Sequence, residues 1–125
     1  MLNPEGDVVR ELQPEGEQTP IDPGHLEHLR TGMEMSVNRD WGAGHNAFRP
    51  GLNIAGKTGT AEFTDAYGNI KEHAWFTGYY PAHDPEVAVT VYFDLGIGGN
   101  KAAPAAAEIL EFYDEGTHRE QVQTP

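Results

Sequence analysis

Residues 51–63 read Gly51-Leu-Asn-Ile-Ala-Gly-Lys-Thr-Gly-Thr-Ala-Glu-Phe63, and this stretch decides which fold the chain can adopt. Its first part, residues 51–58, matches the phosphate-binding loop pattern G-x-x-x-x-G-K-[ST]. Such a loop follows a buried strand and opens a helix, so that the helix N-terminus faces the phosphate. Here a polar, glycine-containing loop comes before the pattern, and residues 59–63 favour a strand. We therefore predict that Lys57 lies in a strand, and a nucleotide-binding loop is the less favoured interpretation.

The stretch quoted above contains one expected strand, and two further segments that are typical of strands follow it, separated by short turns. We expect the first strand over Ile54 to Phe63, the second over His73 to Tyr80 and the third over Val87 to Phe93. The turns are Asp65 to Lys71 and Pro81 to Pro85. Connections this short join antiparallel neighbours, so the sequence predicts a three-stranded antiparallel meander.

Helical patterns lie on both sides of these strands. Asp22 is a good N-cap and Pro23 a good first residue for a helix that ends at Asn38. Apolar residues at helical spacing predict one buried stripe on it: Leu26, Leu29, Met33 and Val37. A second helix is expected from Ala102 to Tyr113, with Ala102, Ala106, Ile109 and Tyr113 on its buried face. The predicted fold class is α+β, with helices flanking a small antiparallel sheet.

The two ends of the chain differ in composition from its centre. Residues 1–20 are acidic and rich in Pro and Gly, and residues 114–125 are polar. We therefore expect an N-terminal segment over 1–20, a folded part over 21–113 and a frayed polar tail over 114–125.

The charge balance excludes several classes of partner. The chain has 125 residues, with 20 acidic against 8 basic residues and a net charge of −12. This argues against nucleic acid and against anionic membrane surfaces as partners.

There is no cysteine, and neither a signal peptide nor a membrane-spanning run is visible. His25 and His28 could chelate a metal, but no further ligand lies at a recognisable spacing, so we expect no metal and no cofactor.

The segments resemble, in order, parts of one family. Gly51 to Glu62 resembles the third-motif strand of high-molecular-weight penicillin-binding proteins of class B type, with the Lys-Thr-Gly motif at Lys57-Thr58-Gly59. The segments His73 to Pro81 and Val87 to Phe93 resemble the next two strands. Asp22 to Asn38 and Gly99 to Tyr113 resemble the flanking helices. The resemblance implies that residues 21–113 form the C-terminal part of a transpeptidase domain with the β-lactamase/transpeptidase-like fold.

The resemblance also implies roles for four residues in binding a peptide that ends in D-Ala-D-Ala, or a β-lactam. Lys57 would act electrostatically on the substrate carboxylate and near the nucleophile, and Thr58 and Thr60 would hydrogen-bond that carboxylate. Gly59 would leave room for a substrate beside the strand. The backbone N–H of Thr60 would help to form the oxyanion hole. The intact enzyme of this family cross-links peptidoglycan at the extracytoplasmic face of the bacterial membrane.

The nucleophile of the family is missing from this chain. Catalysis requires a serine in an S-x-x-K motif, and the only serine, Ser36, is followed three residues later by Arg39. An arginine stays protonated and cannot act as the base. Ser36-Val37-Asn38 does spell the second motif, S-x-N, but it lies too close to Lys57, and we interpret it as a coincidence. The chain alone is therefore expected to be inactive.

The missing part of the domain has a consequence for partners, and it leaves an alternative function open. The chain is expected to need the N-terminal portion of the transpeptidase domain as a partner, since one of its strands would pair with Val87 to Phe93 and would otherwise leave that edge bare. The alternative function is a non-catalytic module that binds β-lactams or stem peptides reversibly.

Overall fold

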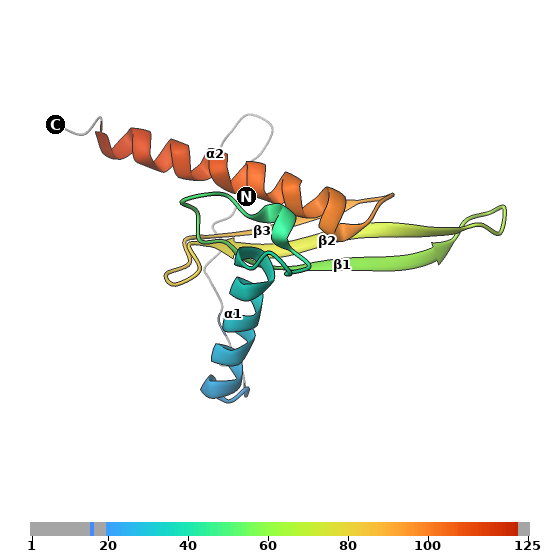
Figure 1. The fold of residues 1–125 in the computed structure, drawn as a ribbon, viewed down its shortest axis with the longest axis horizontal. Helices are drawn as coiled ribbons and strands as arrows, with labels where there is room; N and C mark the ends of the chain where they lie inside the picture. Colours follow the sequence, from blue (N-terminus) through green and yellow to red (C-terminus); the bar gives the residue numbers. More distant parts are fainter. Residues whose placement is uncertain (1–15, 17–19, 123–125) are drawn as a thin grey trace, which may run out of the picture.

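We analysed a computed structural model that describes residue 16 and residues 20–122. The expectations for residues 1–15 and 17–19 lie outside the described residues. The elements, in chain order, are α1 (Pro23–Asn38), a 3-10 turn η1 (His45–Ala47), β1 (Ala55–Thr64), β2 (Ile70–Tyr80), β3 (Val87–Phe93), a π-helical turn η2 (Gly98–Ala102) and α2 (Ala103–Val122). In Figure 1, α2 crosses one side of the sheet and α1 projects from the other.

The three strands form the predicted antiparallel meander, in the order β1-β2-β3. β2 begins at Ile70, earlier than predicted, because the turn before it is compact. Asp65 closes this turn by accepting hydrogen bonds from the backbone N–H groups of Tyr67 and Asn69, each at 2.9 Å. Hydrogen bonds from the side chain and backbone of Asn69 hold the pKa of Asp65 below its usual value. The paired strands therefore reach almost to the turn.

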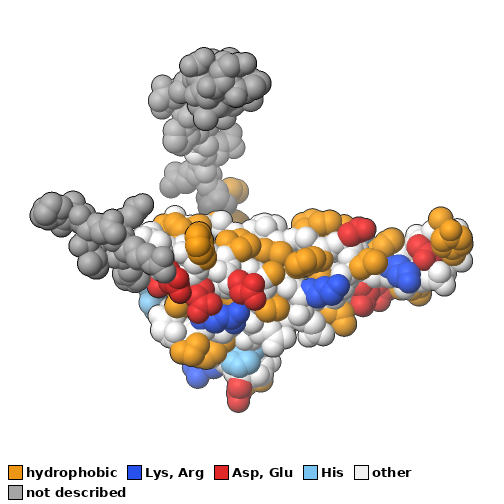
Figure 2. All heavy atoms as spheres, turned by 90° about the horizontal axis from the view of Figure 1, so that it is seen from above, with side chains coloured by type: hydrophobic (Ala, Val, Ile, Leu, Met, Phe, Trp, Pro, Cys, Tyr) orange, Lys and Arg blue, Asp and Glu red, His pale blue; other side chains and the backbone are white. Residues whose placement is uncertain are grey.

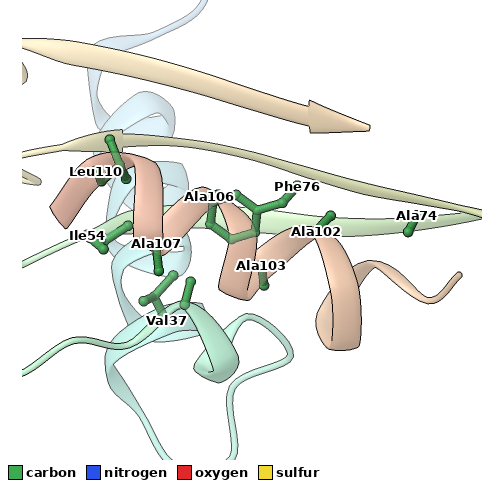
Figure 3. Packing of buried hydrophobic residues seen from close by; sticks show 10 residues of the cluster. Val37, Ile54, Ala74, Phe76, Ala102, Ala103, Ala106, Ala107 and Leu110 are labelled. Atoms are coloured by element: carbon green, nitrogen blue, oxygen red, sulfur yellow. The ribbon is translucent and has the colours of Figure 1, made fainter. Parts of the chain in front are cut away.

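The core lies between the sheet and α2. Phe76 of β2 is fully buried and points towards the alanine-rich start of α2 (Figure 3). The inward-facing residues at the start of α2 have small side chains, which allows the helix to pack closely on the sheet. The buried residues of α2 are Ala103, Ala106, Ala107 and Leu110. The prediction was wrong for Ile109, which is 51% exposed, since the inward face is rotated towards Leu110.

The first helix begins as predicted, because the Asp22 side chain accepts a hydrogen bond from the backbone N–H of Gly24 at 2.8 Å. The predicted buried stripe was confirmed at Val37 and wrong at Leu29, while Leu26 and Met33 are half-buried. Val37 is fully buried, whereas Leu29 is 58% exposed. Only the C-terminal turns of α1 reach the sheet, and the remainder extends away from it (Figure 1). The apolar stripe is therefore covered progressively less towards the N-terminal part of α1 within the described residues.

The second helix continues to Val122, beyond its predicted end at Tyr113 and through much of the segment expected to be a frayed tail. Hydrophobic side chains are visible among acidic ones on the side of the molecule viewed in Figure 2. Of the residues on α2, Phe112 is 79% exposed. No helix within residues 20–122 is both long enough and apolar enough to cross a bilayer.

Candidate functional site

The four predicted site residues lie on β1, which is an edge strand of the sheet. Thr58 pairs with Phe76 and Thr60 with Ala74, so both threonines face α2 and η2. Lys57 pairs with the exposed Thr77 and lies on the opposite face, together with Gly59. The structure therefore places the lysine and the hydroxyl groups on two sides of one strand edge. A ligand along this edge would be contacted from both sides.

Lys57 is exposed, and its ammonium group donates a hydrogen bond to the backbone carbonyl of Thr58. Among the described residues, Lys57 forms no ion pair with a carboxylate within 4.0 Å. An ammonium group without a carboxylate partner is available to bind an anion. This is the electrostatic feature expected of a carboxylate-binding strand.

The hydroxyl oxygen of Thr60 accepts a hydrogen bond from the backbone N–H of Gly98 at 3.3 Å. A hydroxyl group can donate one hydrogen bond while it accepts another. The contact with Gly98 therefore orients the Thr60 hydroxyl and leaves its proton free for a ligand. Sequence reasoning missed Gly98, although the glycine pair Gly98-Gly99 before the closing helix is a signal for close packing of the backbone.

Gly59 lies opposite Trp75 in the register. A Cβ atom at Gly59 would lie 3.3 Å from the Cβ atom of Trp75, which is tighter than ordinary van der Waals contact. A side chain at this position would therefore require Trp75 to shift by a few tenths of an ångström. Room for a substrate beside the strand stays a prediction.

A pocket of about 340 Å³ borders Lys57. Its other walls are Gly32, Met35 and Ser36 of α1 and Trp41, Gly42 and Ala43 of the following loop. Trp41 thus lines a cavity beside Lys57. His45 does not line it, and its ring contacts the Val37 carbonyl at 3.1 Å and stacks on Phe48.

The Ser36-Val37-Asn38 triplet has a structural explanation. The side-chain amide of Asn38 donates hydrogen bonds to the backbone carbonyls of Glu34 and Ile54, at 2.9 and 2.8 Å. These bonds join the end of α1 to the start of β1. The Ser36 hydroxyl oxygen is buried and has no hydrogen-bond partner among the described residues. This geometry agrees with the interpretation of the triplet as a coincidence.

The nucleotide-binding loop is contradicted by the structure. Strand β1 runs through Lys57 to Thr64, and no helix begins after the G-x-x-x-x-G-K-T pattern. The backbone N–H groups therefore cannot converge on a phosphate as they do at a helix N-terminus. Within the described residues there is also no group of three His, Asp or Glu side chains placed to hold a metal ion.

Comparison with known proteins gives one consistent result. The family model "Penicillin binding protein transpeptidase domain" matches residues 5–111. The chain is 35% identical over 100 residues to the peptidoglycan D,D-transpeptidase MrdA of Haemophilus influenzae, covering 70% of this chain and 15% of that protein. It is 35% identical over 126 residues to the penicillin-binding protein PbpB of Mycolicibacterium smegmatis, covering 89% and 19%.

Solved structures agree with the sequence comparisons. The D,D-transpeptidase domain of a peptidoglycan glycosyltransferase from Eggerthella lenta matches with a TM-score of 0.70 and 27% identity, over 93% of this chain and 26% of that one. Penicillin-binding protein 2B from Streptococcus pneumoniae matches with a TM-score of 0.68 and 26% identity, over 91% and 20%. The chain thus spans about a quarter or less of the length of these relatives. It belongs to the penicillin-binding protein transpeptidase family and comprises part of the transpeptidase domain.

Proposed function

We propose that this chain is the carboxylate-binding, C-terminal part of a peptidoglycan D,D-transpeptidase domain. The observation that carries the proposal is the position of Lys57, which is exposed on an edge strand of the described sheet, with Thr58 and Thr60 on the opposite face of that strand. No carboxylate of the described residues lies within 4.0 Å of its ammonium group. In the intact protein this domain would act at the extracytoplasmic face of the bacterial membrane, where peptidoglycan is cross-linked.

The substrate would be a stem peptide ending in D-Ala-D-Ala, and a β-lactam would occupy the same edge. The Lys57 ammonium would attract the terminal carboxylate, and the hydroxyl groups of Thr58 and Thr60 would donate hydrogen bonds to it. The backbone N–H of Thr60 would stabilise the oxyanion that forms when the carbonyl carbon is attacked. Binding energy at the carboxylate would thereby hold the reacting carbonyl in position.

The nucleophilic serine would come from a part of the domain outside this chain. It would form an acyl-enzyme with the donor peptide, and the amine of a second stem peptide would then release the acyl group. The N-terminal portion of the transpeptidase domain is therefore the partner that the proposal requires. Ser36 cannot take this role, because its hydroxyl oxygen is buried.

A chimera tests this assignment. In it, the present chain replaces the matched segment of Haemophilus influenzae MrdA, and acylation by a fluorescent penicillin is timed. Lys57→Ala should lower the second-order acylation rate roughly 10- to 100-fold, because a hydrogen bond to a charged group contributes about 1.5–3 kcal/mol. Lys71→Ala is the matched control, since Lys71 is an exposed lysine on the next strand. An unchanged rate in the Lys57 variant would contradict the proposal.

A reversible, non-covalent binding module is the second candidate, because the chain contains no S-x-x-K motif with which to form an acyl-enzyme. A chain that has the carboxylate-binding strand but no reactive serine could bind a β-lactam without opening its ring. Equilibrium dialysis of the isolated chain against benzylpenicillin tests this. Saturable binding at micromolar concentration, with no mass increase of the protein, would favour the module over the domain fragment.

A further inference from the structure

His73 of β2 connects the hairpin of β1 and β2 to the loop that follows β3. Its Nδ1 atom lies 2.8 Å from the backbone carbonyl oxygen of Asp94 and 3.0 Å from the hydroxyl oxygen of Tyr92. Its ring stacks on that of Phe63 of β1, with the ring centroids 4.1 Å apart and the planes at 7°. The half-buried imidazole of His73 therefore contacts both neighbouring strands and the first residue after β3.

The acceptors around His73 determine which ring nitrogen carries the proton. The carbonyl oxygen of Asp94 can only accept a hydrogen bond, so the Nδ1 atom must donate it. The Tyr92 hydroxyl group donates to the Asp94 carboxylate at 3.0 Å, which leaves the Tyr92 oxygen as a second acceptor for the same N–H group. This pattern assigns the Nδ1–H tautomer to His73. A ring without that donor would keep the stacking and lose both hydrogen bonds.

The loop held by this imidazole leads directly to Gly98. A second hydrogen bond, from the backbone N–H of Gly96 to the carbonyl oxygen of Glu72 at 2.8 Å, joins the same loop to β2. η2 then begins at Gly98, whose N–H donates to the Thr60 hydroxyl oxygen at 3.3 Å. Three residues separate Asp94 from Gly98. A displacement of the loop at Asp94 would therefore move the donor that orients the Thr60 hydroxyl group.

We propose that His73 is a positioning residue for Thr60, and this inference rests on the proposed function. The imidazole holds the loop at Asp94, the loop places the Gly98 N–H group, and that group orients the Thr60 hydroxyl for the substrate carboxylate. A hydroxyl group that is oriented before the carboxylate arrives loses less freedom on binding. His73 would thus assist binding at β1 through the loop after β3, without contacting the substrate.

A double-mutant cycle in the MrdA chimera tests whether His73 acts through Thr60. His73→Phe keeps a ring and removes the Nδ1–H donor, and it should lower the second-order rate of penicillin acylation roughly three- to tenfold, as for the loss of one hydrogen bond. In the Thr60→Val background the same change should alter the rate less than about twofold, because the hydroxyl through which it acts is already absent. An equal loss in both backgrounds, or no loss in either, would overturn the proposal.

Two further variants distinguish positioning from a general loss of stability. His73→Asn places an amide donor near the position of Nδ1 and should restore most of the acylation rate. Tyr80→Phe is the matched control, because it also removes one hydrogen bond made by β2, the bond to Asp114 at 2.6 Å at the other end of the strand. Its effect on the rate should be the same with threonine and with valine at position 60. Coupling to Thr60 as large as that of His73→Phe would overturn the proposal.

Amide exchange tests the same connection without catalysis. Hydrogen–deuterium exchange of the 125-residue chain, followed by NMR spectroscopy, should be about threefold or more faster at Gly98 in His73→Phe than in the parent. Exchange should be unchanged at Ala82, whose N–H donates to the Asn53 carbonyl oxygen at 2.8 Å. Unchanged exchange at Gly98, or equal acceleration at both amides, would overturn the proposal. Faster exchange at Gly98 alone, with a chimera that penicillin never acylates, would keep the connection and reject the proposed function.

Discussion

Gly98 lies directly against Gly59, so that a Cβ atom at Gly98 would come within 2.3 Å of the Gly59 carbonyl oxygen and 2.6 Å of the Trp75 carbonyl oxygen. Both contacts are with backbone atoms, which cannot move aside as a flexible side chain can. Gly98→Ala should therefore push η2 away from β1 and destabilise the fold by about 1–3 kcal/mol. Urea unfolding followed by circular dichroism measures this. Gly16→Ala is the control, because its Cβ atom meets none of the described residues within 4 Å, and an equal loss in both variants would contradict the packing argument.

The Thr60 hydroxyl is expected to contribute to acylation more than to stability. Thr60→Val in the chimera removes the donor that we assign to the substrate carboxylate, and it should slow acylation roughly tenfold, in line with about 1.5 kcal/mol for a hydrogen bond to a charged group. Thr60→Ser keeps the hydroxyl group and should restore most of the rate. Stopped-flow acylation with a fluorescent penicillin compares the three proteins. Equal rates for the valine and serine variants would exclude a role for the hydroxyl.

Leu110 and Ile109 are neighbours on α2 with opposite environments: Leu110 is fully buried and Ile109 is 51% exposed. Leu110→Ala should cost about 2–5 kcal/mol, because it removes buried methyl groups and leaves a cavity in the core. Ile109→Ala should cost much less, as expected for a half-exposed side chain. Denaturant titration of the two variants measures the difference, and a larger loss at Ile109 would mean that α2 presents the other face to the sheet.

Tyr80 should make stability depend on pH in the alkaline range. Its hydroxyl group donates a hydrogen bond to Asp114 at 2.6 Å, and this bond, with burial and the nearby carboxylate charge, raises the pKa of Tyr80 to about 12 from its ordinary value of 10.0. The folded state therefore holds the proton more tightly than the unfolded state. The stabilisation is complete below pH 10 and is lost as the pH rises towards about 12. Tyr80→Phe should flatten the stability profile over this interval, and an identical slope in the variant would reject the assignment.

The isolated chain should be marginally stable or should self-associate. β3 is an edge strand of the described sheet, and unpaired edge groups recruit other strands. Sedimentation velocity at micromolar concentration measures the association. Thr90→Lys, an exposed position on β3, should reduce it, because a charge on an edge strand opposes pairing. A cooperative melt of a monomer at this concentration would contradict the expectation.

Local patterns predicted the elements well, because each signal acts over a few residues. Asp22 and Pro23 set the start of α1, and the spacing of the turns set the meander. The faces of the helices were harder to predict. The stripe through Leu29 has the right period, but only tertiary packing decides that α1 extends away from the sheet. On α2, several alanines allowed more than one inward face, and the close approach to Phe76 selected the one that includes Leu110.

The roles of the four candidate site residues stay predictions, and their arrangement on the strand was not predicted. The motif identified Lys57, Thr58, Gly59 and Thr60, and strand alternation could have placed the lysine and the threonines on opposite faces. The contact between Thr60 and Gly98 joins residues far apart in the sequence, so no local pattern reports it. The same holds for the pocket that α1 and Trp41 form beside Lys57.

The central claim is that this chain holds the carboxylate-binding edge of the domain while the nucleophile lies elsewhere. The most direct test is to incubate the isolated chain and the MrdA chimera with a fluorescent penicillin, denature both, and locate any covalent label by gel and peptide mapping. We predict a label on the chimera, at a serine outside the residues of this chain, and none on the isolated chain. A covalent label on Ser36 of the isolated chain would contradict the claim, because the only serine of the chain would then be a nucleophile.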